Sequence, residues 1–171
     1  MDRTEVEKEI TDFLENIFKE VSIAAVLEFP EEKNANDLYY IDITTGDSNI
    51  IIGYHGETLN SLQHILNLFL FKKFDEKIHV LLDVAGYREE RDDKLKELAK
   101  SASEKARFLD KSVALYAMNS YERKIVHEAV SEIENVTSES EGEGANRRVV
   151  ISPESVGDSE SSDDGENNEE E

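Results

Sequence analysis

The alternation of apolar and polar residues along the first half of the chain predicts a small mixed domain. Apolar residues recur at helical spacing in three segments and alternate or cluster as in strands in three others. We expect, in chain order, a helix over 4–20, strands over 21–29 and 38–44, a short helix over 48–52, a long helix over 57–73 and a strand over 77–84. In the last strand Lys77, His79 and Asp83 should face solvent, and the apolar residues between them should face the core. A three-stranded sheet with helices on one face gives a two-layer α+β domain over residues 1–85.

The second half of the chain shows the same two periodicities in a different order. We expect a charged helix over 88–109, a strand over 111–118, a helix after Asn119, and a hairpin with strands over 136–140 and 147–151. The apolar stripe of the charged helix is thin and consists of Leu95, Leu98, Ala102 and Leu109. Helices on a small sheet would form a second domain over 86–153. Residues 154–171 are rich in serine and acidic residues, so we expect a disordered acidic tail.

Two helix starts carry the pattern of a capping box. In this motif a Ser, Thr or Asn side chain accepts from a backbone N–H, and a glutamate three residues later reaches back. Thr4 with Glu7 and Asn119 with Glu122 have the required spacing. Each pair therefore predicts where its helix begins.

A Gly-x-x-Gly loop, Gly53-Tyr54-His55-Gly56, separates the short helix from the long one. Because neither glycine has a Cβ, a nucleic-acid backbone could lie close to the main chain. The N–H groups in the first turn of the next helix, together with the helix dipole, favour phosphate at this point. Two glycines three residues apart also occur at plain corners between helices, so the loop alone leaves both interpretations open.

The predicted helix after Asn119 places an arginine and a histidine on one face. Arg123 and His127 are four residues apart, and a guanidinium can bind phosphate while an imidazole hydrogen-bonds or stacks on a base. Lys124, Arg147 and Arg148 could extend this surface. The alternative is structural, with the histidine partly buried beside a glutamate and the arginine in a surface ion pair.

Charge argues against nonspecific nucleic-acid binding. The formal net charge is −21, and without residues 154–171, which contain nine acidic and no basic residues, it is still −12. Any nucleic-acid site must therefore be a local patch. The chain has no cysteine, no apolar run long enough to span a bilayer and no signal-peptide pattern, so we expect a cytoplasmic protein without membrane insertion.

The predicted element order of the first domain resembles a type II KH domain. The Arg-x-x-x-His helix at residues 123–127, followed by the segment 140–151, resembles an R3H domain. A KH module followed directly by R3H resembles the Jag (SpoIIIJ-associated) family of bacterial proteins over roughly residues 1–153. Many members carry an additional N-terminal Jag domain. This sequence starts at the KH helix, so we expect the chain to lack that domain. The functions assigned to the additional domain are therefore not expected of this chain.

The resemblance implies a post-transcriptional regulator that binds single-stranded RNA, associates with a small stand-alone KH protein and acts in cell elongation or division. The nucleic-acid contacts it implies are Gly53, Tyr54, His55, Gly56, Arg123, Lys124, His127, Arg147 and Arg148. The family often has basic residues between the two glycines, whereas here Tyr54 and His55 offer stacking and little charge. Ser120 stands where the family often has proline at a helix start.

Two other function classes stay open. A protein-interaction adaptor with weak RNA affinity would fit the acidic composition, and single-stranded DNA would fit both motifs because neither by itself reads the 2′-OH. We expect no enzyme, because the sequence lacks a Walker loop, a nucleophile elbow and a Rossmann glycine set. The four histidines show no metal-ligand spacing, so no catalytic residue, cofactor or metal is predicted.

Overall fold

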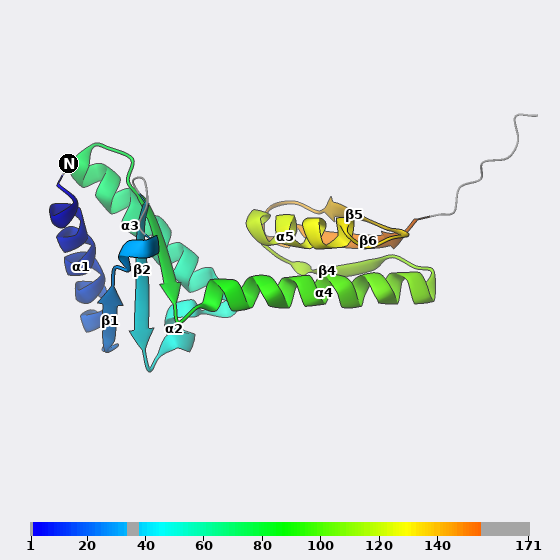
Figure 1. Cartoon of the computed structure of the whole chain (residues 1–171), viewed down its shortest axis with the longest axis horizontal. Coiled ribbons are helices and arrows are strands. Elements are labelled where there is room, and N and C mark those ends of the chain that lie inside the picture. The colour runs from blue at the N-terminus through cyan, green and yellow to red at the C-terminus, as the bar shows by residue number, and fades with distance from the viewer. Residues whose placement is uncertain (1, 34–37, 155–171) are drawn as a thin grey trace, which may run out of the picture. The chain divides into compact units, whose positions relative to one another are not determined.

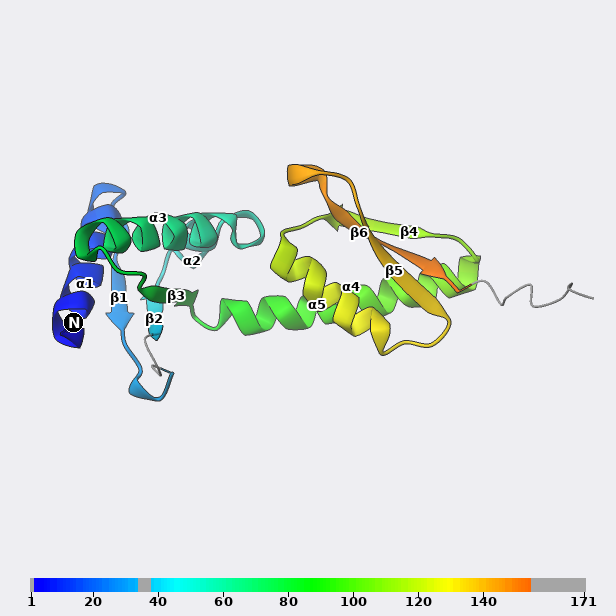
Figure 2. The same cartoon turned by 90° about the horizontal axis from the view of Figure 1, so that it is seen from above.

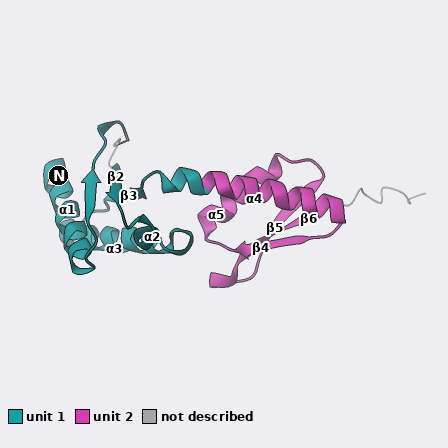
Figure 3. Cartoon of the chain, turned by 90° about the horizontal axis from the view of Figure 1, so that it is seen from below, with its two compact units in different colours: residues 1–91 teal, residues 92–171 magenta. Residues whose placement is uncertain are grey.

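The computed structural model describes residues 2–33 and 38–154. The chain divides into two compact units, residues 1–91 and 92–171 (Figure 3). Each unit has an apolar core of its own. The acidic tail that the sequence predicts falls outside the described residues from residue 155 onward.

Unit 1 is a two-layer α+β domain, as the periodicity predicts (Figure 1). Its main elements are α1 (Arg3–Glu20), β1 (Ala25–Glu28), β2 (Leu38–Thr45), α2 (Ser48–Ile52), α3 (Glu57–Phe74) and β3 (His79–Val84). In the sheet, β2 lies between an antiparallel β1 and a parallel β3. Buried residues of α1 and α3 share one core with the inward residues of β2 and β3. The strand β3 therefore lies at an edge of the sheet.

The first strand is shorter than the predicted 21–29. The chain after α1 first makes a helix-terminal turn, in which the N–H of Val21 donates to Ile17 and that of Ser22 donates to Lys19. Ser22 has a positive φ of 59°. These residues close the helix, so pairing with β2 begins only at Ala25.

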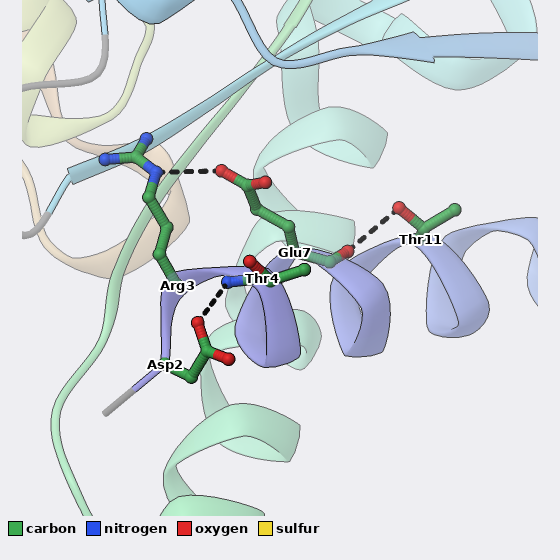
Figure 4. A network of polar contacts seen from close by, with 5 residues as sticks. All are labelled: Asp2, Arg3, Thr4, Glu7 and Thr11. Carbon is green, nitrogen blue, oxygen red and sulfur yellow. Dashed lines mark hydrogen bonds and ion pairs between the residues drawn. The ribbon is translucent and has the colours of Figure 1, made fainter.

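The capping box predicted at Thr4 is wrong (Figure 4). The N-cap is Asp2, whose side chain accepts from the Thr4 N–H at 3.1 Å. Glu7 accepts from Nε of Arg3 at 2.8 Å and its carbonyl accepts from the Thr11 hydroxyl. The helix is thus capped by the carboxylate of Asp2, two residues before the predicted cap at Thr4.

Asp83 was predicted to face solvent, and this is also wrong, because the side chain is only 4% exposed. Its Oδ2 accepts from the Tyr40 hydroxyl at 2.7 Å, and its Oδ1 accepts from the backbone N–H groups of Val84 and Arg88. Burial and the neighbouring carboxylate raise the pKa of Tyr40 well above its usual range. Through these hydrogen bonds the Asp83 carboxylate links the end of β3 to the first turn of the next helix.

Unit 2 carries its helices on a small antiparallel sheet, as predicted (Figure 2). Its elements are α4 (Tyr87–Leu109), which begins in unit 1, then β4 (Val113–Ala117), α5 (Ser120–Ser131), β5 (Val136–Glu141) and β6 (Arg148–Pro153). The strand order is β4-β6-β5. The capping box of Asn119 and Glu122 is confirmed at the start of α5.

The contact face of α4 is made mainly of small residues. Leu95 and Ala102 are buried as predicted, together with Ala99 and Ala106. Leu109, which the apolar stripe had included, is 46% exposed because it is the last residue of the helix and the chain turns away at Asp110. The neighbouring α5 runs parallel to α4, since Tyr121 donates to Asp92 near one end and Arg107 donates to the carbonyl of Glu134 near the other.

Candidate nucleic-acid interface

The Gly-x-x-Gly loop of unit 1 forms a tight turn between α2 and α3. Gly53 has φ 71° and ψ −166°, a conformation that is almost restricted to glycine. A single 3-10 turn over Tyr54–Gly56 follows, with positive φ at His55 (50°) and Gly56 (82°). The loop thus reaches the start of α3 in three residues.

Both glycines are also required by the packing of unit 1. A Cβ on Gly53 would lie 2.7 Å from Cβ of Thr58, and a Cβ on Gly56 would lie 2.9 Å from Cε1 of Tyr87. Neither distance is sterically tolerable without a shift of the neighbour. The glycines therefore have a structural role whether or not the loop holds a ligand.

The tip of the loop presents polar and aromatic groups to solvent. Tyr54 is 71% exposed, and its ring centroid lies 4.1 Å from that of His55. The N-cap of α3 is Gly56, so no side chain caps the N–H groups of the first turn. Uncapped amides at a helix N-terminus, beside an exposed aromatic ring, suit a phosphate group and an unpaired base.

An open groove of about 420 Å³ runs between α3 and the edge strand β3. Its lining residues are Gln63, His64, Asn67, Leu68, Phe71, Lys77, Ile78, His79 and Val80. Leu68 and Phe71 are more than half exposed, as is Ile65 on the same helix. This groove was not predicted from the sequence, although Ile65, Leu68 and Phe71 are large apolar residues that lie off the buried face of α3 and were a visible signal.

In unit 2, Arg123 holds the turn that precedes α5. Its guanidinium donates from Nη1 to the carbonyl of Met118 at 2.8 Å and from Nη2 to the Ser120 hydroxyl at 2.9 Å. The backbone N–H of Met118 donates to the carbonyl of Arg147 at 3.1 Å. The structure thereby brings Arg123 close to the start of β6, where Arg147 and Arg148 are exposed.

His127 lies against β5, one helical turn beyond Arg123. Its Nδ1 is 2.7 Å from the Ser138 hydroxyl and its Nε2 is 2.8 Å from the Ser140 hydroxyl. The histidine is half-buried, and its neighbours are serines, where the structural alternative expected a glutamate. Burial, and secondarily the charge of Arg123, lower the pKa of His127.

Unit 2 should lose stability as the pH falls below 6.5. His127 has an ordinary pKa of 6.5 when unfolded and a lower pKa when folded, so the unfolded chain binds the proton more readily. The stabilisation is complete above pH 6.5 and is lost as the pH falls toward the folded pKa. Melting temperatures at pH 7.5 and 5.5 measure the loss, with His127→Gln as the control for the other titrating groups. An equal loss in the His127→Gln variant would contradict this assignment.

Two other residues predicted to contact nucleic acid, Lys124 and Arg148, each lie near a glutamate. Lys124 pairs with Glu128 at 3.4 Å on the exposed side of α5. Arg148 lies opposite Glu141 in the β5–β6 pairing. Both cations therefore have a carboxylate nearby that a phosphate would have to displace or tolerate.

Residues 2–33 and 38–154 contain neither a cluster of metal ligands nor a membrane-spanning helix. Within these residues, no three His, Cys, Asp or Glu side chains gather as metal ligands. No helix there is both long and apolar enough to cross a membrane.

Models of two protein families match the chain in the order found in the structure. The KH-domain model of KhpA and KhpB matches residues 7–82, and the R3H-domain model matches residues 93–153. The chain contains a KH domain followed by an R3H domain, which is the domain order of the Jag proteins that its sequence resembles. The KH match lies within unit 1, and the R3H match lies within unit 2.

Several proteins named RNA-binding protein KhpB are similar to this chain. The protein from Clostridium symbiosum is 35% identical over 141 residues, which cover 82% of this chain and 63% of the relative. That from Lactiplantibacillus plantarum is 32% identical over 142 residues, covering 83% and 43%. That from Bacillus subtilis is 36% identical over 112 residues, covering 64% and 54%. The chain thus spans between 43% and 63% of the length of these relatives.

Proposed function

We propose that this chain binds single-stranded RNA and acts as a post-transcriptional regulator in the cytoplasm, linked to cell elongation or division. The observation that carries the proposal is an uncapped helix N-terminus behind the Gly-x-x-Gly loop, in the same unit as the α3–β3 groove. The amides of the loop and first turn would hold the phosphates, and the groove would take the bases. The relatives named as RNA-binding proteins support this choice of ligand.

The groove also meets the requirement for a local patch in an acidic chain. Although the sequence contains 40 Asp and Glu residues, none of the described residues that line the groove is acidic. Lys77 contributes a positive charge, and His64 and His79 can donate hydrogen bonds. A phosphate chain can thus approach the groove without meeting a carboxylate on its lining.

The direct test is fluorescence anisotropy with a labelled eight-nucleotide single-stranded RNA at low salt. We expect binding of the single strand, and weak or no binding of the same RNA as a duplex, because paired bases cannot enter the groove. A DNA oligonucleotide of the same sequence measures the contribution of the 2′-OH. Failure of the folded protein to bind any single strand would overturn the proposal.

A second contact in the R3H domain would involve Arg123 and His127. Arg123→Ala should weaken RNA binding more than His127→Ala, because a charge-assisted contact is the stronger one. The salt dependence of binding should become shallower by about one counterion for the arginine. Anisotropy titrations between 50 and 200 mM salt, normalised to the folded fraction from circular dichroism, measure both effects. If both variants lower the melting temperature and leave the affinity of the folded fraction unchanged, the pair is structural.

The alternative function, a protein-interaction adaptor, is favoured by a different observation on the same unit. Ile65, Leu68 and Phe71 leave more than half of their surface exposed on α3. Such residues are common at protein interfaces, and a small stand-alone KH protein is the partner that the family resemblance implies. Replacing Ile65, which is not among the residues that line the groove, by glutamate should abolish association with that partner while leaving RNA affinity unchanged.

A further inference from the structure

The side chain of Gln63 in the α3–β3 groove is held in one orientation. Its Oε1 accepts from the backbone N–H of Leu82 at 3.0 Å and from Nη2 of Arg88 at 2.9 Å. Arg88 is fixed in turn, because its Nε donates to the carbonyl of Leu82 at 2.8 Å and its backbone N–H donates to Asp83. An amide has one oxygen and one NH2, so with the oxygen occupied the NH2 remains for the groove.

A second amide lies one helical turn further along α3. The Oδ1 of Asn67 is buried and has no hydrogen-bond partner, while the residue itself lines the groove. The group that Asn67 can offer to a ligand in the groove is therefore its NH2. Lys77, across the groove, is also a pure donor. The lining thus presents hydrogen-bond donors from three side chains, with no carboxylate among the described residues that line it.

We infer that the groove selects a base whose edge projects carbonyl oxygens, with uracil preferred over adenine, and that Gln63 is the specificity-determining residue. This inference rests on the proposed RNA binding. The atoms that project furthest from the pairing edge of uracil are carbonyl oxygens, which accept from the amide NH2 groups. On the corresponding edge of adenine the projecting group is an amine, and it would meet another donor. Arg88 is the positioning residue, because it fixes which end of the Gln63 amide faces the ligand.

The variant Gln63→Glu tests this inference without disturbing the fold. One carboxylate oxygen can still accept from Leu82 and Arg88, while the second oxygen replaces the NH2 as an acceptor facing the groove. For the wild type we expect eight-nucleotide U8 to bind about fivefold more tightly than A8, roughly the worth of one hydrogen bond. For Gln63→Glu the ratio should disappear or reverse. Oligothymidine of the same length should follow U8 if the carbonyl edge is the feature recognised.

The control separates the added charge from the change of hydrogen-bonding group. Ser61→Glu places the same charge on the exposed side of α3, outside the residues that line the groove, and should weaken U8 and A8 equally. An unchanged ratio in folded Gln63→Glu, or a wild-type preference for A8, would overturn this inference alone. If no single strand binds the wild type, the proposed function fails and the inference fails with it.

Discussion

Replacing both Tyr54 and His55 by aspartate should weaken single-stranded RNA binding by about 30- to 1000-fold at ~0.1 M salt, or about 2–4 kcal/mol. The two carboxylates would stand where phosphates must approach, and they would compete for the uncapped N–H groups at the start of α3. Tyr54 is exposed and neither residue belongs to the apolar core, so unit 1 should keep its fold.

Anisotropy on a short labelled strand measures this loss, and circular dichroism reports the fold. The matched control is Asn16→Asp with Ser22→Asp, which adds two carboxylates outside the loop and the groove. That control should lose little affinity, because the charges are solvated and screened. Unchanged affinity in the folded Tyr54 and His55 variant would mean that residues 53–56 are only a corner between helices.

Substituting Gly53 by alanine should destabilise unit 1 by roughly 3 kcal/mol, because the φ and ψ of this residue are nearly restricted to glycine. The new Cβ would in addition overlap the side chain of Thr58, which cannot move without disturbing the first turn of α3. Loss of binding in this variant would therefore report unfolding and not the removal of a phosphate contact.

Denaturant unfolding, followed by circular dichroism, measures the change in the free energy of unfolding. Gly46→Ala is the matched control, because Gly46 has no positive φ and a Cβ added there would meet no atom within 4 Å. It should be near neutral. Equal stability of the two variants would show that the loop relaxes to accept a side chain.

The periodicity of apolar residues was sufficient to predict the order of helices and strands in both domains. The prediction succeeded because each long helix and each strand buries one face. The apolar residues therefore repeat along the sequence at the same spacing as the buried positions of the element. The cap at Asn119 was predicted for a local reason, since a capping box involves residues only three apart. The position of the Gly-x-x-Gly loop between two helices was predicted in the same way.

Features that depend on contacts between distant segments were not predicted. Asp83 lies at an outward position of β3, and nothing in the strand itself indicates that Tyr40 and Arg88 bury it. The groove was missed because its two walls, α3 and β3, meet only in the folded domain. The serines that hold His127 belong to a strand that follows its helix, and a spacing rule for ligands does not identify them.

The first turn of α4 completes the KH domain, although it lies beyond the last strand of the KH sheet. Tyr87 occupies the space left by Gly56, and Arg88 orients Gln63. A KH domain cut after β3 would keep every helix and strand of its fold and still lose Arg88, which orients the Gln63 amide in the groove. The structural unit that a fusion or a truncation must preserve is therefore longer than the KH fold and includes the start of α4. A partner domain joined directly after residue 84 would leave Oε1 of Gln63 with only one of its two hydrogen-bond donors.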